Sequence, residues 1–326
     1  MKRQIVIWPL ATVLLTTVSL AEEQRAAKVL RLGFLAFNVE RSASDTDAFF
    51  QEMRRLGWVD GQNIAIEYRN AQGKVERLPG LAAELVGLKV DMILASSTPA
   101  ALAARQASAT IPIVFTLVSD PVGIGLVASL ARPGGIITGV SNINEELSVK
   151  RLELLKETFP RVSRVAVLFN PADPISRPEL KDVEAAARIL RLQLKLYEAR
   201  DAKDLDGIAA AWVKARPGAL FVVTSQFFAG ERARVFEMAA RSRLPTIFWN
   251  SAFVDAGGLM SYGANVAALN RRAAYYVDRI LKGTKPADLP VERPMRFEFV
   301  INLKTAKQIG VTIPPNVLVR ADRVIL

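Results

Sequence analysis

The sequence predicts an α/β protein built from two units, each a parallel sheet with helices on both faces. Its 326 residues suit two domains of ordinary size. Short apolar runs with strand character alternate with segments of helical spacing along most of the chain. The alternation begins again at 164–169, which divides the chain into two comparable halves. Such a rhythm is typical of parallel strands, because each strand is followed by a crossover helix.

The first half contains both periodicities. Residues 63–68 (NIAIEY) alternate apolar and polar side chains, as a half-buried strand does, whereas 43–56 places Phe49, Phe50 and Met53 on one helical face. The expected strands are 29–36, 63–68, 90–95, 111–118 and 136–140, and the expected helices are 43–56, 78–88, 99–107, 122–130 and 145–157.

The second half repeats the pattern and then adds further elements. The expected strands are 164–169, 192–197, 219–224 and 245–248, and the expected helices are 178–190, 202–215 and 230–241. A strand (259–263), a long helix (267–281), a Pro-rich linker (285–294), a late strand (296–301) and a short helix (303–310) follow. Because two units are already complete, we expect these additions to return to the earlier sheets. The chain then crosses between the units more than once, and 139–144 is the first candidate hinge.

The N-terminus has the pattern of an export signal. Lys2 and Arg3 precede an apolar run at 5–18, and Ser19-Leu20-Ala21 supplies small residues before a cleavage point. The run is shorter than the roughly 20 residues of a membrane span. We expect cleavage near Ala21 and a soluble periplasmic product. The alternative is an uncleaved membrane anchor.

The composition excludes several kinds of chemistry. The chain has no Cys and no His, so it has no thiolate nucleophile, no Ser-His-Asp triad and no Cys or His ligand for a metal. We therefore expect neither a catalytic centre nor a metal or other cofactor. Carboxylate, Lys, Tyr and bound-cofactor chemistry stay possible. The net charge is +11, but the basic residues are scattered, as at Arg54-Arg55 and Arg271-Arg272, which predicts a solvated surface and no nucleic-acid partner.

Candidate ligand-binding residues follow from the topology, because ligands bind beyond the carboxyl ends of the strands in open parallel sheets. Thr98, with Pro99 at the first helical position, begins a helix whose free N–H groups suit an anionic group. We expect Ser97 and Thr98 to bind such a group, Asp120 to bind a cationic group, and Trp249 or Tyr262 to pack against the ligand. The full candidate set is Phe37, Asn38, Ser96, Ser97, Thr98, Ser119, Asp120, Asn170, Ser225, Gln226, Trp249, Asn250 and Tyr262.

Each of these residues also has a structural interpretation. Thr98 and Asp120 are ordinary helix caps, and Phe248, Trp249 and Phe253 are ordinary core aromatics. No phosphate-binding G-x-x-x-x-G-K-[ST] motif or dinucleotide-binding fingerprint occurs. No carboxylate pair stands at the strand ends as an acid/base couple.

A set of motifs along the mature chain resembles a known family. These are GFL (33–35), LGWVDGQNIAIEYR (56–69), RLPGLAAELV (77–86), IPIVFTLVSDPVGIGLVASLARPGG (111–135), ITGVSN (137–142), KRLELLKE (150–157), GGLMSYG (257–263), DRILKGTKPADLPVERP (278–294) and FEFVINLKTAKQIGVTIPP (297–315). In this order they resemble the ABC transporter substrate-binding proteins of the tryptophan/tyrosine type.

The resemblance implies a type I periplasmic-binding-protein fold: two Rossmann-like lobes with parallel sheets, joined by a multi-strand hinge. It implies that helix 267–281 belongs to the first lobe and the final strand and helix to the second. We expect a signal peptide at 1–21, a first lobe at 22–141 plus 259–284, and a second lobe at 142–258 plus 285–326. It also implies an amino-acid carboxylate bound at the helix start that follows Ser96, Ser97 and Thr98.

Three functional hypotheses remain. The first is an exported, monomeric solute receptor that closes around an amino acid or aromatic acid and delivers it to an ABC transporter permease, without catalysis. The second is an enzyme with an active site between the lobes, which buried carboxylates facing across the cleft with raised pKa values would favour. The third is the sensing module of a transcriptional regulator, which the export signal and the lack of a helix-turn-helix segment oppose.

Overall fold

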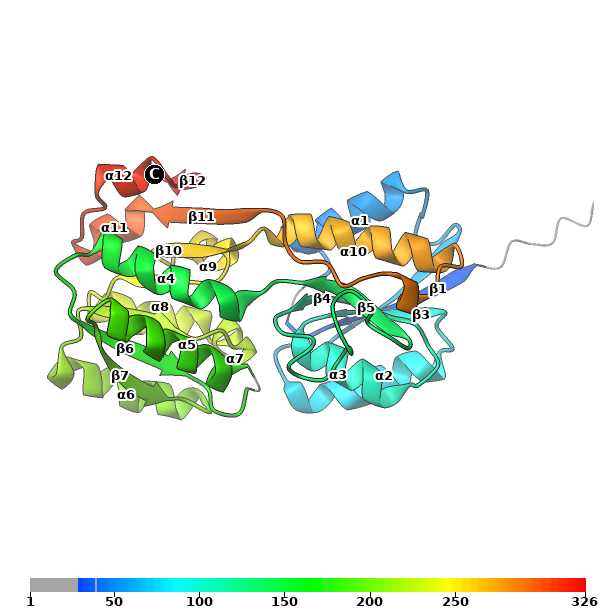
Figure 1. Cartoon of the computed structure of the whole chain (residues 1–326), viewed down its shortest axis with the longest axis horizontal. Helices are drawn as coiled ribbons and strands as arrows, with labels where there is room; N and C mark the ends of the chain where they lie inside the picture. The colour runs from blue at the N-terminus through cyan, green and yellow to red at the C-terminus, as the bar shows by residue number, and fades with distance from the viewer. Residues whose placement is uncertain (1–28, 39, 174) are drawn as a thin grey trace, which may run out of the picture.

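The computed structural model of the chain describes residues 29–38, 40–173 and 175–326. Two α/β lobes lie side by side along the long axis of the molecule (Figure 1). The expected signal peptide at 1–21 lies outside the described residues. Within the part of the chain that the structure describes, no helix is long and apolar enough to span a bilayer.

The first lobe contains a five-stranded, fully parallel sheet in the order β2-β1-β3-β4-β5. The strands are β1 (Leu30–Ala36), β2 (Ile64–Asn70), β3 (Met92–Ser96), β4 (Ile113–Val118) and β5 (Ile137–Ser141). The central strand β3 is buried throughout and apolar up to its last residue, as expected of a strand covered on both faces. Its last residue, Ser96, lies between Ala36 of β1 and Thr116 of β4 at the carboxyl edge of the sheet.

Helices cover both faces of this sheet (Figure 1). On one face, α1 (Ser44–Arg55) and α10 (Val266–Leu281) pack together and contribute to one apolar cluster. On the other face, α2 (Leu78–Gly87), preceded by the short η1 (Val75–Arg77), and α3 (Thr98–Ala107) form a second cluster. Helix 267–281, which the resemblance assigns to the first lobe, packs as α10 against α1 and against strands of the first sheet.

The helix expected at 122–130 is wrong. Residues 121–125 form turns and 126–128 a bend. The Asp120 carboxylate accepts a hydrogen bond from the Gly123 N–H at 2.8 Å, and Gly125 has a φ of 68°, which lies outside the helical region. Two glycines so close together favour turns over a helix. The helix was predicted from the spacing of apolar residues, which does not take the glycines into account.

The second lobe contains a seven-stranded sheet in the order β12-β11-β10-β9-β8-β6-β7. The strands are β6 (Arg164–Phe169), β7 (Gln193–Glu198), β8 (Ala219–Val222), β9 (Thr246–Phe248), β10 (Met260–Ala264), β11 (Phe297–Asn302) and β12 (Arg323–Ile325). All pairs are parallel except β10 with β11. The antiparallel pair arises because the chain leaves this lobe after β10, forms α10 in the first lobe and re-enters from that side.

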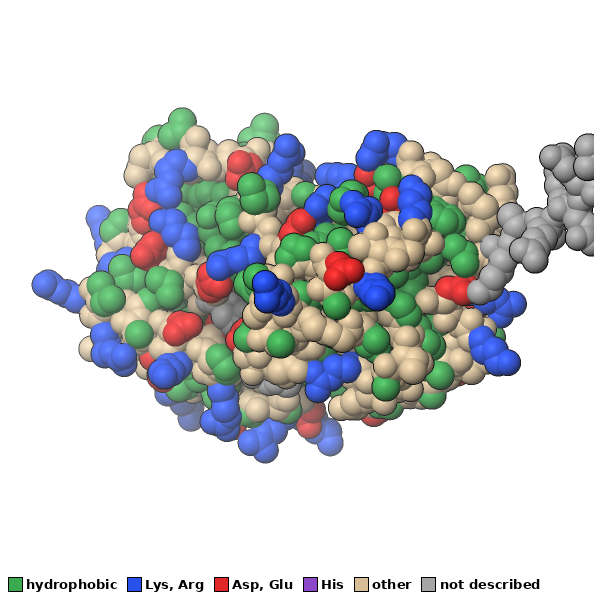
Figure 2. Space-filling model, turned by 45° about the vertical axis from the view of Figure 1, so that its right-hand side comes forward, with side chains coloured by type: hydrophobic (Ala, Val, Ile, Leu, Met, Phe, Trp, Pro, Cys, Tyr) green, Lys and Arg blue, Asp and Glu red, His purple; other side chains and the backbone are tan. Residues whose placement is uncertain are grey.

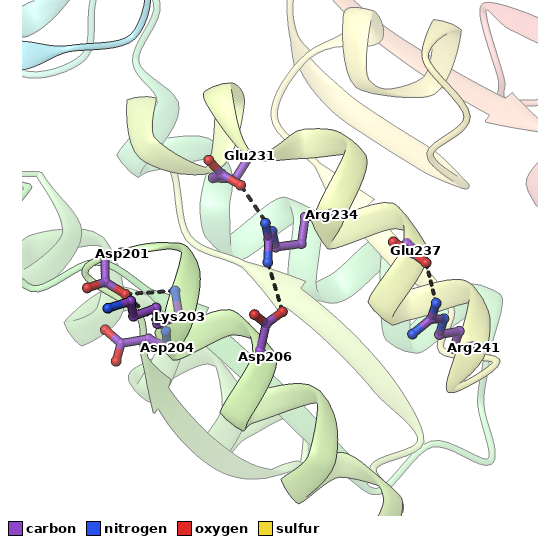
Figure 3. Close-up of polar contacts among 8 residues, drawn as sticks. All are labelled: Asp201, Lys203, Asp204, Asp206, Glu231, Arg234, Glu237 and Arg241. Carbon is purple, nitrogen blue, oxygen red and sulfur yellow. Dashed lines mark hydrogen bonds and ion pairs between the residues drawn. The ribbon is translucent and has the colours of Figure 1, made fainter.

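Helices again lie on both faces. One layer consists of α4 (Asn144–Thr158), α5 (Ser176–Ile189), α11 (Leu303–Ile309) and α12 (Pro315–Leu318). The other consists of α6 (Ala202–Ala215), α7 (Gln226–Gly230), α8 (Arg232–Arg241) and α9 (Ser251–Asp255). Figure 3 shows how α6 and α8 are joined: Arg234 forms ion pairs with Asp206 at 2.8 Å and with Glu231 at 3.3 Å. The carboxylate of Asp201 caps α6 by accepting from the N–H groups of Lys203 and Asp204.

The chain crosses between the lobes three times, between β5 and α4, between β10 and α10, and before β11. Ahead of the third crossing, η2 (Pro286–Asp288) packs on β5, and Glu292 forms a parallel bridge with Val140. The Ser141 N–H donates to the Glu292 carbonyl oxygen at 2.8 Å, and the Glu292 N–H donates to that of Gly139 at 3.1 Å. The Glu292 carboxylate pairs with Arg272 of α10 through two contacts of 2.6 Å.

These pairings change the expected lobe boundaries. Strand 260–264 hydrogen-bonds to β9 and β11 of the second sheet, so it does not belong with 259–284 of the first lobe. Residues 286–292 lie against the first lobe, although they were expected in the second. Periodicity predicts that a strand exists but not which strand edge accepts it. We therefore propose a first lobe of 29–141 plus 266–292 and a second lobe of 144–264 plus 297–326.

Candidate ligand-binding site

A cavity of about 670 Å³ lies between the two lobes, and residues from both form its walls. Eight of the candidate residues line it: Phe37, Asn38, Ser96, Thr98, Ser119, Gln226, Trp249 and Asn250. They follow β1, β3 and β4 of the first sheet and β8 and β9 of the second. The carboxyl ends of strands from both sheets therefore meet at one cavity, as the topology rule predicts.

The first-lobe wall carries an unpartnered hydroxyl. Ser96 is 6% exposed, and its Oγ has no hydrogen-bond partner among the described residues. The neighbouring Ser97 differs, because its Oγ caps α3 by accepting from the Ala100 N–H at 3.2 Å. Thr98, the first residue of α3, lines the cavity. Since a buried polar atom without a partner is costly, the Ser96 hydroxyl is suited to a ligand atom.

The second-lobe wall combines aromatic rings with an amide. Trp249 is 5% exposed and packs edge-on against Phe253, with ring centroids 4.3 Å apart. Both rings line the cavity, so the aromatic residues serve the core and the cavity wall together. The Oδ1 atom of Asn250, next along the chain, is buried and likewise has no partner in the described part. The cavity thus has, on each of its opposite walls, a residue with a buried polar atom that lacks a partner in the described part of the chain.

Five candidate residues do not line the cavity: Ser97, Asp120, Asn170, Ser225 and Tyr262. Four of them accept local main-chain hydrogen bonds: Ser97 Oγ from the Ala100 N–H, Asp120 Oδ1 from that of Gly123, Asn170 Oδ1 from that of Ala172 and Ser225 Oγ from that of Phe227. Tyr262, on β10, packs against Phe297 and Phe299. The side chains of these five residues therefore serve local structure and do not line the cavity. The residue type alone could not distinguish these two roles.

Several polar residues of the cavity wall were not among the candidates. They are Glu40, Asp45, Thr46, Asn142, Asn144, Asp173, Thr224, Arg232, Asp255 and Asn270. Asn142 and Asn144 lie at the hinge segment that the sequence indicated, which was the available signal. Asp45 and Asp255 belong to helices, where the strand-end rule does not look.

Two of the wall carboxylates have shifted pKa values. Burial raises the pKa of Asp173, against the lowering effect of hydrogen bonds from the N–H groups of Ile175 and Gln226 and from Ser225. Burial also raises the pKa of Asp45, and the negative charges of Glu298 and Asp255 raise it further. Negative charges of the second lobe thus act on a carboxylate of the first lobe.

A buried ion pair supports the second-lobe wall from behind. Arg151 and Glu179 have fully buried side chains and lie 2.8 Å apart. The same Arg151 nitrogen donates to the Asn144 carbonyl oxygen at 2.9 Å, and Glu179 accepts from the Thr224 N–H at 3.1 Å. Burial raises the pKa of Glu179, which the adjacent Arg151 opposes. Because Asn144 and Thr224 both line the cavity, the pair fixes two points of its wall.

Two parallel-sheet lobes, three crossings and a cavity between the lobes define a ligand-binding protein with the type I periplasmic-binding-protein fold. The chain belongs to the ABC transporter substrate binding protein family, whose pattern matches residues 42–325. Among its relatives, the tyrosine-binding protein of Clostridioides difficile (strain R20291) is 30% identical over 260 residues, which cover 79% of this chain and 74% of the relative.

Solved structures give the same assignment. A conserved domain protein from Vibrio cholerae has a TM-score of 0.83 at 28% identity, covering 91% of this chain and 100% of its own. An ABC domain from Streptococcus pneumoniae in complex with L-Trp has a TM-score of 0.81 at 27% identity, covering 91% and 99%. A ligand-free, open substrate-binding protein from Clostridium difficile, with the same identity and coverage, has a TM-score of 0.65. The chain as a whole thus superposes better on the L-Trp complex than on the ligand-free structure.

Proposed function

We propose that this protein is an exported receptor that captures an aromatic amino acid between its lobes and delivers it to the permease of an ABC transporter. The observation that carries the proposal is the pair of buried, unpartnered polar atoms, Ser96 Oγ and Asn250 Oδ1, at one cavity. A zwitterionic ligand offers the hydrogen bonds that both atoms lack. The aromatic rings of Phe37 and Trp249 supply apolar area for a planar side chain.

The ligand class is supported by the relatives, one named for tyrosine and one solved with L-Trp. Ser96 and Thr98 are the groups that we assign to the ligand's carboxylate, in place of Ser97 and Thr98. The receptor acts as a monomer after cleavage near Ala21, without catalysis. Positive and negative side chains are interspersed over the visible surface (Figure 2), which suits a protein with no nucleic-acid partner.

Calorimetry of the mature protein, refolded to remove carried-over ligand, tests the proposal. L-tryptophan, L-tyrosine, other amino acids, nucleosides and sugars form the panel, and the bound compound is recovered and analysed. We expect binding of an aromatic amino acid that is recovered unchanged. Binding of a sugar or nucleoside alone would contradict the ligand class, and a chemically altered compound would favour the enzyme.

Two adjacent serines give a matched pair of variants. Ser96→Ala should weaken the ligand by about 1 kcal/mol, roughly fivefold, because one hydrogen bond is lost, and should leave the stability of the free protein nearly unchanged. Ser97→Ala should lower stability by about 1 kcal/mol through loss of the α3 cap and leave affinity unchanged. The reverse pattern would remove Ser96 from the site.

A further inference from the structure

The charged residues of the cavity wall are unequally divided. Among the described residues, its titratable side chains are the carboxylates Glu40, Asp45, Asp173 and Asp255 and one guanidinium, that of Arg232. The whole chain, in contrast, carries a net charge of +11. The cavity is therefore a negative region in a basic protein, which favours a ligand with a positively charged group.

Three of these carboxylates have partners within the protein. Asp255 pairs with Arg323 through contacts of 2.6 and 3.1 Å, Asp173 accepts from main-chain N–H groups, and Glu40 accepts from the Asn70 amide at 3.3 Å. The carboxylate of Asp45 has no hydrogen bond or ion pair with any residue in the described ranges. Among the described residues of this wall, it is the carboxylate without a partner in the protein.

Hydrogen bonds link the start of α1, where Asp45 lies, to the strand end that carries Ser96. The Asn270 amide donates to the Asp45 carbonyl oxygen at 2.8 Å, and its Oδ1 accepts from the Thr116 hydroxyl at 3.3 Å. Thr116 is in turn the strand neighbour of Ser96. This chain of contacts fixes the start of α1 relative to the carboxyl edge of the sheet. Ser96, more than nine-tenths buried and facing the same cavity, is an independent sign of a ligand there.

Asp255 approaches from the other lobe. It is the last residue of α9, it lines the same cavity, and its charge acts on Asp45 together with that of Glu298 on β11, while Arg323 on β12 acts in the opposite sense. Asp45 and Asp255 line one cavity from opposite lobes, and the repulsion between their charges, which Arg323 offsets only in part, opposes closure. A cation between them replaces this repulsion with two attractions, one to each lobe.

We propose that the positively charged group of the ligand, the ammonium of an amino acid, binds between the carboxylates of Asp45 and Asp255 and thereby links the two lobes. The inference rests on the proposed function and adds to it the group that drives closure. It also reassigns the cationic contact, which the sequence placed at Asp120. A ligand that lacks the ammonium group then binds poorly, however well its ring fits.

Three probes separate the groups of the ligand. L-tryptophan carries both charges, tryptamine only the ammonium and indole-3-propionate only the carboxylate. We expect the wild-type protein to bind the first two and to bind indole-3-propionate at least about tenfold more weakly. Asp45→Asn should weaken L-tryptophan and tryptamine at least about tenfold and leave indole-3-propionate unchanged or tighter. Asp47→Asn, on the same helix but outside the cavity wall, is the matched control and should change none of them.

The outcomes distinguish the two proposals. If the wild type binds none of the probes, nor L-tyrosine, the proposed receptor function fails. If it binds indole-3-propionate as tightly as L-tryptophan, or if Asp45→Asn weakens all three probes equally, the receptor stands and the ammonium site is overturned. Small-angle scattering of the ligand-free proteins gives a second measurement. Asp45→Asn should be more compact than the wild type, and an identical profile would contradict the repulsion across the cleft.

Discussion

The two walls of the cavity differ in how their polar groups are satisfied. In the second lobe, Arg151 and Glu179 are buried behind the wall and bonded to Asn144 and Thr224. In the first lobe, the Asp45 carboxylate and the Ser96 hydroxyl reach the cavity without a partner in the described part of the chain. The second lobe therefore combines an internally bonded wall with one unpartnered amide oxygen, that of Asn250, whereas the first lobe presents a carboxylate and a hydroxyl without partners.

Breaking the buried pair should have the largest effect. Glu179→Leu leaves the Arg151 charge buried without its counter-ion, and we expect the free energy of unfolding to fall by about 3–5 kcal/mol. Urea denaturation measures this loss. The double variant Arg151→Met with Glu179→Leu should recover much of it, because no uncompensated charge remains. A single variant as stable as the wild type would show that the second-lobe wall does not depend on the pair.

A backbone contact tests the same wall at a second point. A Cβ atom added at Gly263 of β10 would lie 1.8 Å from the Trp249 carbonyl oxygen, so main chain must move to admit it. We expect Gly263→Ala to destabilise the protein by about 1–3 kcal/mol and to weaken ligand binding through Trp249. Gly207→Ala, in α6 with open space around it, is the control and should slightly stabilise the protein in thermal melting.

A substitution at Asp120 tests whether this first-lobe residue stabilises a turn or binds the ligand. Asp120→Ala removes the acceptor for the Gly123 N–H, and we expect a loss of about 1 kcal/mol in stability with ligand affinity unchanged. Melting curves and calorimetry on the same sample measure both quantities. A selective loss of affinity for ammonium ligands would restore the role that the sequence predicted for this residue.

The smallest effect should be a pH dependence from Asp45. Its pKa is raised in the folded protein by burial and by Glu298 and Asp255, so its contribution to stability is present below the unfolded pKa and is lost as pH rises through the folded pKa. Ligand-free Asp45→Asn should therefore gain stability relative to the wild type as pH rises above about 4, the ordinary pKa of an aspartate. Denaturation at several pH values measures the difference, and a constant difference would contradict the shift.

Much of the fold followed from periodicity, because buried parallel strands such as β3 are apolar throughout and leave a clear signal. The sheet that receives β10 did not, since the choice depends on which strand edge is free when the chain returns. The helix expected at 122–130 was wrong for a local reason, the pair of glycines beside Asp120.

The expectation that ligands bind at the carboxyl ends of parallel strands predicted Ser96, Trp249 and Asn250 as site residues, and all three line the cavity. It missed Asp45 because an acidic residue in the first turn of a helix has an ordinary explanation, the helix dipole. To distinguish a residue that favours the helix dipole from one that binds a ligand, one must know which residues form the opposite cavity wall. For Asp45 this includes Asp255, which is more than two hundred residues further along the chain.

The bridge between Val140 and Glu292 has a mechanical consequence. It ties the third connection to the first by main-chain hydrogen bonds, and the Arg272 ion pair fastens the same point to α10. Adjacent, fastened connections resist torsion much more than bending. The lobes should therefore open by a hinge-bending motion, with little rotation about the long axis of the molecule. At each closure, the side chains of the two cavity walls then regain the same relative positions. A ligand that is bound by both walls can therefore be recognised in every transport cycle.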